Sequence, residues 1–366
     1  MPSANVQTVL GPIKVESLGR TLIHEHLIAS FPGVEFDLFH PFDRPRFVTE
    51  AVKRLRALKE FGVESFVDPC PIELGRDVEL FAEVSEKSEI NIVCTTGFYF
   101  EAWGLPIYWR MRTVEEIAEL YIHELEQGCG NTKIRAGAIK CATDANPTEI
   151  EEKFLAAACI AQRATGVPII THTQNGLGGP EQQALFARGN VQAHHCLIGH
   201  CCGNADPAYH RRVVDGGSYI GFDRVGKLQF QPDDVRADNL VTLVRDGFGA
   251  RIMISQDAYC DMLGRYHPVR QLPAAEIAKV MEQKKLGTWP QPYTYLFTDF
   301  LPRLRARGLT DGEILPMLDE NPRRFSRVSR WPGTNNQRVW LNATLEACKS
   351  HSRNTAMSRL SLRSRG

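Results

Sequence analysis

Short runs of apolar and β-branched residues alternate along the chain with longer stretches in which apolar residues recur every three or four positions. The short runs are typical of strands, and the longer stretches have the periodicity of amphipathic helices. Eight strand-like runs begin near Thr21, Glu64, Asn91, Ile134, Pro168, Cys196, Gly217 and Arg251. Helices are predicted at residues 46–61, 78–87, 114–127, 148–165, 182–189, 207–215 and 233–246.

Strands that alternate with helices pair in parallel through right-handed crossover connections. Eight such units close into a (β/α)8 TIM barrel, which is the α/β fold that this pattern predicts. The alternative is an open, doubly wound sheet. No GxGxxG motif follows the first strand, and five different runs end in a chemically active residue, so the barrel is favoured.

A long loop is predicted after the eighth strand, over residues 258–290. Loops of this length are often functional, so we expect it to overhang the barrel mouth as a lid or specificity loop, with a plain surface insertion as the alternative. A helix is then expected over residues 293–307. A shorter one is expected to open at Thr310 and to end by Asn321.

The chain has 366 residues, of which 43% are hydrophobic, so it can bury one large core. Residues 1–325 are therefore predicted to form a single barrel domain. The composition changes to Arg, Ser and Asn beyond this point. We expect residues 326–366 to form a C-terminal tail that is disordered or loosely docked.

Basic and acidic residues balance at 43 each, so the formal net charge is zero. A neutral chain has no overall field to recruit nucleic acid or an anionic membrane, which favours a small, roughly neutral substrate. No stretch approaches the roughly 18 apolar residues of a membrane span, and the N-terminus lacks the pattern of a signal peptide. The sequence predicts a cytoplasmic protein.

The first strand-like run ends in His24-Glu25-His26, and residues two apart in an extended strand project to the same face. Four later runs also end in a residue that can bind a metal or carry a charge. These residues are Lys140, His172, His200 and Asp257. Because the carboxyl ends of barrel strands converge on one site, we expect all six side chains to meet there.

Neutral imidazoles and a carboxylate are ligands for zinc, iron, cobalt or manganese, and six donors are too many for one tetrahedral ion. The sequence therefore predicts two divalent ions, with zinc as the expected metal. A lysine beside two cations cannot remain an ammonium without strong repulsion. Lys140 is then neutral, or its amine has reacted with carbon dioxide to give a carbamate, N6-carboxylysine, which could bridge the metals.

Each of these residues has a plainer interpretation when it is taken alone. His172 and His200 could be buried histidines with ordinary hydrogen bonds, Asp257 a helix N-cap and Lys140 a salt-bridge partner. The ten cysteines lack the spacing of a disulfide scaffold and are expected to be reduced and buried. A metal site at Cys201 and Cys202 is a weaker alternative, since neighbours in extended backbone point to opposite faces.

Eight motifs, placed mostly at the strand ends, resemble those of the phosphotriesterase family of the amidohydrolase superfamily. They are GRTLIHEHL at 19–27, TTGFY at 95–99, IKCATD at 139–144, VPIITHT at 167–173, LIGHC at 197–201, IGFDR at 220–224, IMISQD at 252–257 and ENPRRF at 320–325. The resemblance runs from Val6 to about Phe325, and within the family it is nearest to the phosphotriesterase-like lactonases.

The resemblance implies specific roles for the strand-end residues. His24, His26 and Asp257 would bind the more buried metal, and His172 and His200 the more exposed one. Lys140, as a carbamate, and a hydroxide would bridge the two ions. The resemblance also covers two further residues. Tyr99 after strand three and Arg224 after strand seven correspond to lactonase residues that lie beside the hydroxide. Without such a role, Tyr99 would only line the mouth and Arg224 would pair with Asp223.

The predicted function is a binuclear metal-dependent hydrolase. It is expected to be a lactonase for acyl-homoserine or other hydrophobic lactones, with promiscuous phosphotriesterase activity. A metal-bridging hydroxide would attack the substrate, and Asp257 would accept its proton. The alternatives are a dedicated phosphotriesterase (aryldialkylphosphatase), another carboxylester or amide hydrolase, and an inactive barrel that serves as a binding protein. Related barrels often dimerise, so a homodimer is one expected assembly.

Overall fold

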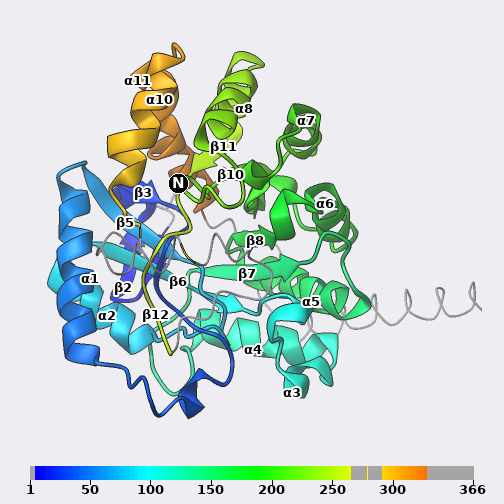
Figure 1. The fold of residues 1–366 in the computed structure, drawn as a ribbon. Helices are drawn as coiled ribbons and strands as arrows, with labels where there is room; N and C mark the ends of the chain where they lie inside the picture. The colour runs from blue at the N-terminus through cyan, green and yellow to red at the C-terminus, as the bar shows by residue number, and fades with distance from the viewer. Residues whose placement is uncertain (1–4, 265–277, 279–290, 328–366) are drawn as a thin grey trace, which may run out of the picture.

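The computed structural model describes residues 5–264, 278 and 291–327, and these form a barrel of parallel strands inside a ring of helices (Figure 1). The eight-stranded sheet has the order β3-β5-β6-β7-β8-β9-β10-β11, and every neighbouring pair in it is parallel. The strands are β3 (Arg20–Leu22), β5 (Val63–Asp68), β6 (Asn91–Gly97), β7 (Ala138–Thr143), β8 (Ile169–Thr173), β9 (Cys196–Ile198), β10 (Tyr219–Phe222) and β11 (Ile252–Ile254). The predicted TIM barrel is confirmed.

The helices of the outer ring follow the strands in chain order. They are α1 (Arg44–Lys59), α2 (Val78–Ser88), α4 (Val114–Glu126), α5 (Glu149–Thr165), α6 (Gly179–Arg188), α7 (Pro207–Asp215), α8 (Asp233–Arg245) and α10 (Leu301–Ala306). Local sequence sets their starts: Thr148 and Glu151 form a reciprocal capping box at α5, and Asp77 caps α2. A short α3 (Ile107–Arg110) precedes α4.

Alternation along each strand divides the apolar residues between two cores. In β11, Ile252 and Ile254 point outward to the helices, whereas Met253 points into the barrel. The barrel interior is filled by one such residue from nearly every strand, so it is a packed core and not a channel. The antiparallel hairpin of β1 (Asn5–Thr8) and β2 (Gly11–Lys14) contributes Val6 to the same interior core.

The barrel closes where the first strand segment meets the last. The backbone N–H of Asp257 donates to the His24 carbonyl at 2.9 Å, and the His24 N–H donates to Ser255 Oγ at 3.1 Å. The seam continues as a short parallel pair between β4 (His26–Ala29) and β12 (Tyr259–Met262). Residues about 230 positions apart in the sequence are thereby brought side by side.

The Glu25 side chain links the two sides of this seam through hydrogen bonds. Its carboxylate accepts hydrogen bonds from Ser255 Oγ, the Gln256 N–H and the Ala258 N–H, each at 2.8 Å, and the side chain is fully buried. Since His24 and His26 flank it on the opposite face of the chain, the central residue of the HxH motif is structural. The motif alone predicted no role for it.

Three element boundaries differ from the sequence prediction. The first strand is split into β3 and β4, with His24 and Glu25 between them, because the chain leaves the barrel sheet there and pairs with β12. The fourth strand begins at Ala138 instead of Ile134, since residues 134 and 136 bond to the end of α4 and its following loop. The predicted loop 258–290 starts as strand β12, and residues 265–277 and 279–290 lie outside the described residues.

The helices after the barrel also differ in detail. The predicted helix 293–307 is a π-helical turn, Leu296–Phe300, followed by α10, whose second residue is Pro302 and therefore lacks an N–H. The last predicted helix is two short ones, α11 (Asp311–Ile314) and α12 (Glu320–Phe325). Helix α12 continues past Asn321, where the predicted helix was expected to end. The tail from residue 328 onward lies outside the described part.

Removing the Glu25 carboxylate should open the seam. Glu25→Ala leaves three buried donors without an acceptor, and each such loss costs about 1 kcal/mol or more, so the free energy of unfolding should fall by about 3 kcal/mol. Urea unfolding of metal-free protein measures this. The matched control is Glu119→Ala, on the exposed side of α4, which should change stability by less than about 0.5 kcal/mol. Equal unfolding midpoints for the two variants would contradict the role of Glu25.

Candidate metal centre

All six predicted ligand residues line one cavity of about 440 Å³ at the carboxyl ends of the strands. His24 and His26 lie at the β3–β4 junction, Lys140 within β7, His172 within β8, His200 directly after β9 and Asp257 after β11. Five of them are buried, and His26 is half-buried. The structure thus brings together the side chains that the sequence grouped, from strands one, four, five, six and eight of the barrel.

The aspartate lies against both histidines of the HxH motif. Asp257 Oδ1 is 3.3 Å from His26 Nε2 and 3.9 Å from His24 Nε2. Single ligand atoms of His24, His200 and Asp257 all lie within 4.8 Å of one another, which is a separation that one metal ion can span.

The other side of the cluster is formed by two more histidines and the lysine. The ring of His200 is 4.7 Å from that of His172 and 4.6 Å from that of His24, measured between centroids. Lys140 Nζ is 3.3 Å from His24 Nε2. A single extra carboxylate group on Lys140 would therefore project into the space between the histidines.

Buried carboxylates lie within hydrogen-bond distance of Nδ1 in three of the four histidines. Asp223 contacts His24 Nδ1 at 2.8 Å and His200 Nδ1 at 3.1 Å, and Asp68 contacts His26 Nδ1 at 3.0 Å. A proton on each Nδ1 leaves the Nε2 lone pair free to face the cavity. This is the outer-shell arrangement that orients histidine ligands in metalloproteins, so the donor set fits divalent metal ions.

His172 has different partners. Its ring nitrogens lie 3.1 Å (Nδ1) from the hydroxyl of Tyr99 and 2.9 Å (Nε2) from Gln174 Oε1. The ring also stacks on Phe100, with 5.5 Å between centroids. Burial raises the pKa of Tyr99, so its hydroxyl stays protonated and can donate. Tyr99 is thus in contact with a predicted ligand.

Burial keeps His24, His172 and His200 in the neutral form that metal binding requires. Burial and then Arg224 lower the pKa of His200 to about 4, and burial lowers the pKa of His24 and of His172 well below the usual value. Burial also lowers the pKa of Lys140 to about 8. An amine with this pKa is partly neutral near pH 7, which is the form that can combine with carbon dioxide.

Two of the predicted ligands are held in strained backbone. His200 has φ of 62° and Asp257 has φ of 53°, in the left-handed region that non-glycine residues rarely adopt. Such conformations persist where surrounding contacts enforce them, and they gather at functional sites. Close packing also fixes Lys140, since a Cβ at Gly97 would collide with the Lys140 carbonyl oxygen.

Arg224 pairs with Asp257 and not with Asp223. Its Nε donates to Asp257 Oδ2 at 3.0 Å, and its guanidinium lies 4.2 Å from the centroid of the Phe230 ring. Of the two Asp257 carboxylate oxygens, Oδ1 therefore lies near His24 and His26, and Oδ2 lies near Arg224. The alternative in which Arg224 is paired with Asp223 is wrong, because both oxygens of that carboxylate are taken by histidines.

Sequence reasoning missed three residues around the centre. Asp68 and Asp223 were not assigned a role, although both directly end a strand, which is the signal that identified the ligands. Lys227 was also missed; its Nζ lies 3.2 Å from Asp257 Oδ2. Burial lowers the pKa of Lys227, and Asp257 acts against this shift. The spacing of Lys227 from Arg224 carries no sequence signal.

Apolar side chains form the outer wall of the cavity. Phe31, Leu74 and Trp103 follow the first three strand positions of the barrel, and Tyr259 and Met262 belong to β12. The predicted loop 258–290 contains this strand, so both side chains lie at the barrel mouth, as expected for that loop.

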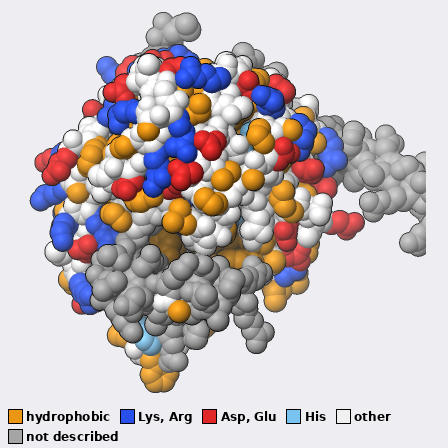
Figure 2. Space-filling view, turned by 45° about the horizontal axis from the view of Figure 1, so that its top comes forward, with side chains coloured by type: hydrophobic (Ala, Val, Ile, Leu, Met, Phe, Trp, Pro, Cys, Tyr) orange, Lys and Arg blue, Asp and Glu red, His pale blue; other side chains and the backbone are white. Residues whose placement is uncertain are grey.

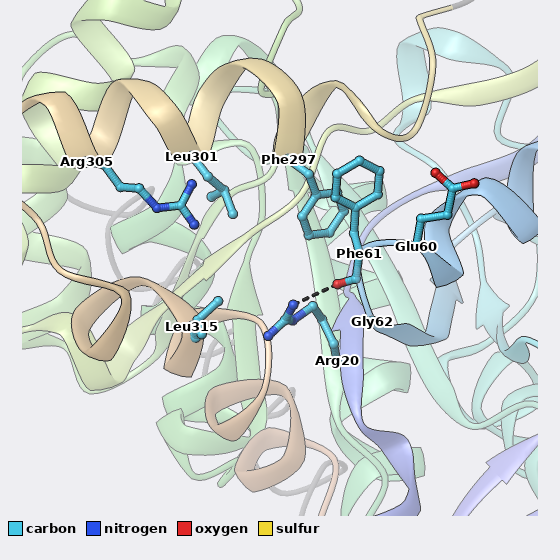
Figure 3. A pocket seen from close by; sticks show the side chains of 8 residues that line it. All are labelled: Arg20, Glu60, Phe61, Gly62, Phe297, Leu301, Arg305 and Leu315. Atoms are coloured by element: carbon cyan, nitrogen blue, oxygen red, sulfur yellow. Dashed lines mark hydrogen bonds between the residues drawn. The ribbon is translucent and has the colours of Figure 1, made fainter.

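A second hollow of about 430 Å³ lies at the other end of the barrel (Figure 3). The Arg20 guanidinium, which lines this hollow, donates to the Phe61 carbonyl at 2.7 Å and also pairs with Asp319 at 3.0 Å. Phe61 and Phe297 stack beside it with 4.9 Å between centroids. These groups satisfy one another, which is typical of the structural end of such a barrel.

Cys201 and Cys202 are not part of the candidate centre. The nine cysteines of the described part are free and buried, as predicted. Cys201 Sγ donates to the Ile198 carbonyl, and Cys202 Sγ accepts from the Arg224 N–H. Within the residues that the structure covers, the groups able to hold a metal include neither of these two cysteines.

A TIM barrel whose mouth gathers four histidines, a lysine and an aspartate defines the class of barrel metallohydrolases. A model of the phosphotriesterase family matches residues 4–326. An aryldialkylphosphatase of Saccharolobus solfataricus is 34% identical over 316 residues, which cover 86% of this chain and 96% of the relative. The chain therefore belongs to the phosphotriesterase family, and this membership implies a binuclear metal site.

Solved structures agree with this assignment. A mutant PTE-like lactonase of Deinococcus radiodurans is 36% identical with a TM-score of 0.80, and the match covers 87% of this chain and 99% of that one. An organophosphorus hydrolase from the same organism is 37% identical with a TM-score of 0.81, covering 89% and 98%. None of the helices in the described ranges has the length and apolar composition needed to cross a bilayer.

Loss of the Asp223 carboxylate should weaken metal binding. Asp223→Asn removes an acceptor shared by His24 and His200, and outer-shell changes of this kind reduce metal affinity by about 10- to 100-fold. Competition with a chromogenic chelator measures the affinity. Asp206→Asn, at the exposed N-cap of α7 where asparagine caps equally well, is the control and should bind metal like the native protein. Unchanged affinity in Asp223→Asn would rule out the outer-shell role.

Proposed function

We propose that this protein is a binuclear metal-dependent lactonase that also hydrolyses phosphotriesters slowly. The observation that carries the proposal is the convergence of His24, His26, His172, His200, Lys140 and Asp257 on one cavity. The close similarity to a PTE-like lactonase structure supports a lactone as the preferred substrate. A dedicated phosphotriesterase is the second candidate, because an aryldialkylphosphatase is similarly related.

We assign the metal ligands in two groups. His24, His26 and Asp257 hold one ion, His172 and His200 hold the other, and Lys140 as a carbamate reaches both. Zinc is the proposed metal, with iron, cobalt and manganese as alternatives, since all accept imidazole and carboxylate ligands. The buried carboxylates that contact three of the imidazoles support this assignment, because they leave Nε2 of His24, His26 and His200 free toward the cavity.

When bound, two such ions supply hydroxide at neutral pH and polarise a carbonyl or phosphoryl oxygen. Proton transfer and orientation are assigned to side chains of the protein. Asp257, through Oδ1, accepts the proton released on attack and passes it to the leaving alkoxide. Arg224 and Lys227 fix the orientation of that carboxylate from its other oxygen. The Tyr99 hydroxyl orients His172, and Tyr99 itself lines the cavity.

The apolar wall favours substrates with hydrophobic substituents. Phe31, Leu74, Trp103 and Met262 line the cavity above the centre. Burial of each methylene contributes about 0.8 kcal/mol to binding, so an acyl or alkyl chain packed here would raise affinity appreciably.

Parallel assays of three substrates test the function. An acyl-homoserine lactone, an alkyl-substituted δ-lactone and paraoxon should be compared with metal-loaded protein. We expect kcat/KM for the better lactone to exceed that for paraoxon by at least 100-fold. Removal of metal by a chelator should abolish all three activities, and zinc should restore them. A higher kcat/KM for paraoxon would favour the dedicated phosphotriesterase, and no hydrolysis of any substrate would favour a binding protein.

The carbamate on Lys140 has a separate test. Lys140→Ala should retain less than about one fifth of the two metal ions expected per chain, because the group that reaches both sites is lost. Short carboxylic acids should restore part of the metal content by occupying the space. In the native protein, labelling with ¹³C-bicarbonate should give a carbamate carbon signal that Lys140→Ala lacks. Full metal content in the variant would remove Lys140 from the centre.

A further inference from the structure

We propose that Lys227 and Arg224 form a subsite for an anionic substituent, a carboxylate or a phosphate, on the substrate. This inference rests on the proposed function, since it concerns the same cavity, and it narrows the substrate to lactones or esters that carry a second, charged group. It departs from the expectation of a neutral substrate that the overall charge of the chain suggests.

The charges around the cavity are unbalanced. Among the described residues that line it and are not proposed metal ligands, Arg224 and Lys227 are basic and none is acidic; Asp257 is the one carboxylate among the proposed ligands. Asp257 Oδ2 receives both Arg224 Nε at 3.0 Å and Lys227 Nζ at 3.2 Å, so two cations share one anionic oxygen. Metal ions would add further positive charge. An anion entering this corner therefore meets a favourable field with little opposing charge.

Arg224 has donor capacity that the protein does not use. Its side chain is 7% exposed, yet Nη1 is buried and has no hydrogen-bond partner within the described ranges. A buried guanidinium N–H without an acceptor is costly, and such groups in native proteins call for an explanation. Because Arg224 lines the cavity, an oxygen of a bound ligand can fill this vacancy.

Acidic and basic side chains are interspersed on the face shown in Figure 2, in keeping with a net charge of zero. The positive excess is a property of the cavity, where Lys227 is held 5.2 Å from the centroid of the Tyr259 ring. A lysine that packs on an aromatic ring and points to a single carboxylate is fixed in position and can contribute to specificity.

Trp103, in the apolar wall, lies across the mouth from the two cations. Arg224 and Lys227 follow β10, the seventh strand of the barrel order, whereas Trp103 follows β6, the third. Strands three and seven of eight stand opposite each other. A substrate that spans the centre could therefore place an apolar part against Phe31 and Trp103 and an anionic part against Lys227.

Matched substrates test the subsite. One pair is a γ-lactone with a carboxylate substituent and its carboxamide analogue; the other is a γ-lactone with a phosphate ester and the corresponding alcohol. We expect native protein to show at least a tenfold higher kcat/KM for the anionic member of one pair, and the pair with the larger ratio identifies the anion. Lys227→Met should lower that ratio at least tenfold, and Lys227→Arg should recover much of it.

A binding measurement separates this inference from the proposed function. The carboxylate-bearing lactam, which resists hydrolysis, should bind metal-free native protein at least tenfold more tightly than it binds Lys227→Met. Lys53→Met, an exposed lysine of α1, is the control and should change neither the ratio nor the binding. If no lactone is hydrolysed, the proposed function fails and lactam binding alone decides the subsite.

Two results would overturn the inference. One is an anionic-to-neutral ratio near one in native protein together with equal lactam binding by native protein and Lys227→Met. The other is an equal fall in kcat/KM for both members of a pair in Lys227→Met, which would mean that Lys227 acts only by positioning Asp257.

Discussion

Closure of the parallel sheet is the constraint on which the whole site depends. The first and last strands of the barrel meet through backbone contacts of His24 and Asp257 and through the buried carboxylate of Glu25. This seam places the HxH histidines directly against Asp257, more than 230 residues further along the chain. An open sheet would leave these groups at opposite edges, and no metal ion could be held by both.

A second layer of interactions turns a cluster of histidines into a candidate metal centre. Asp223 and Asp68 hold the Nδ1 sides of three imidazoles, and burial disfavours the protonated forms of His24 and His200. The cost of burying these carboxylates is offset by charge-assisted hydrogen bonds with good geometry. Positive φ values at His200 and Asp257 show that the surrounding structure enforces the ligand positions.

The arrangement of charges in the cavity depends on the same barrel and bears on substrate specificity. Arg224 and Lys227 share one oxygen of Asp257, so the residue proposed to move a proton is also the anchor of a cationic corner. Trp103, in the apolar wall, stands across the mouth from that corner, whereas Tyr259 packs beside Lys227. Since these groups come from loops after different strands, the fold can vary its substrate while the metal ligands, which lie on or beside the strands, stay in place.

The sequence by itself determined the fold and the candidate ligand set, because strand alternation, helix periodicity and a metal-binding side chain at five of the eight strand ends are local signals. Only the tertiary structure decided the roles of Glu25, Asp68, Asp223 and Lys227. Their partners lie far away in sequence, and a position at or near a strand end does not show whether a carboxylate faces a metal site or supports a histidine. The neutral composition similarly gave no indication of a cationic cavity, since total charge does not reveal which charges face inward.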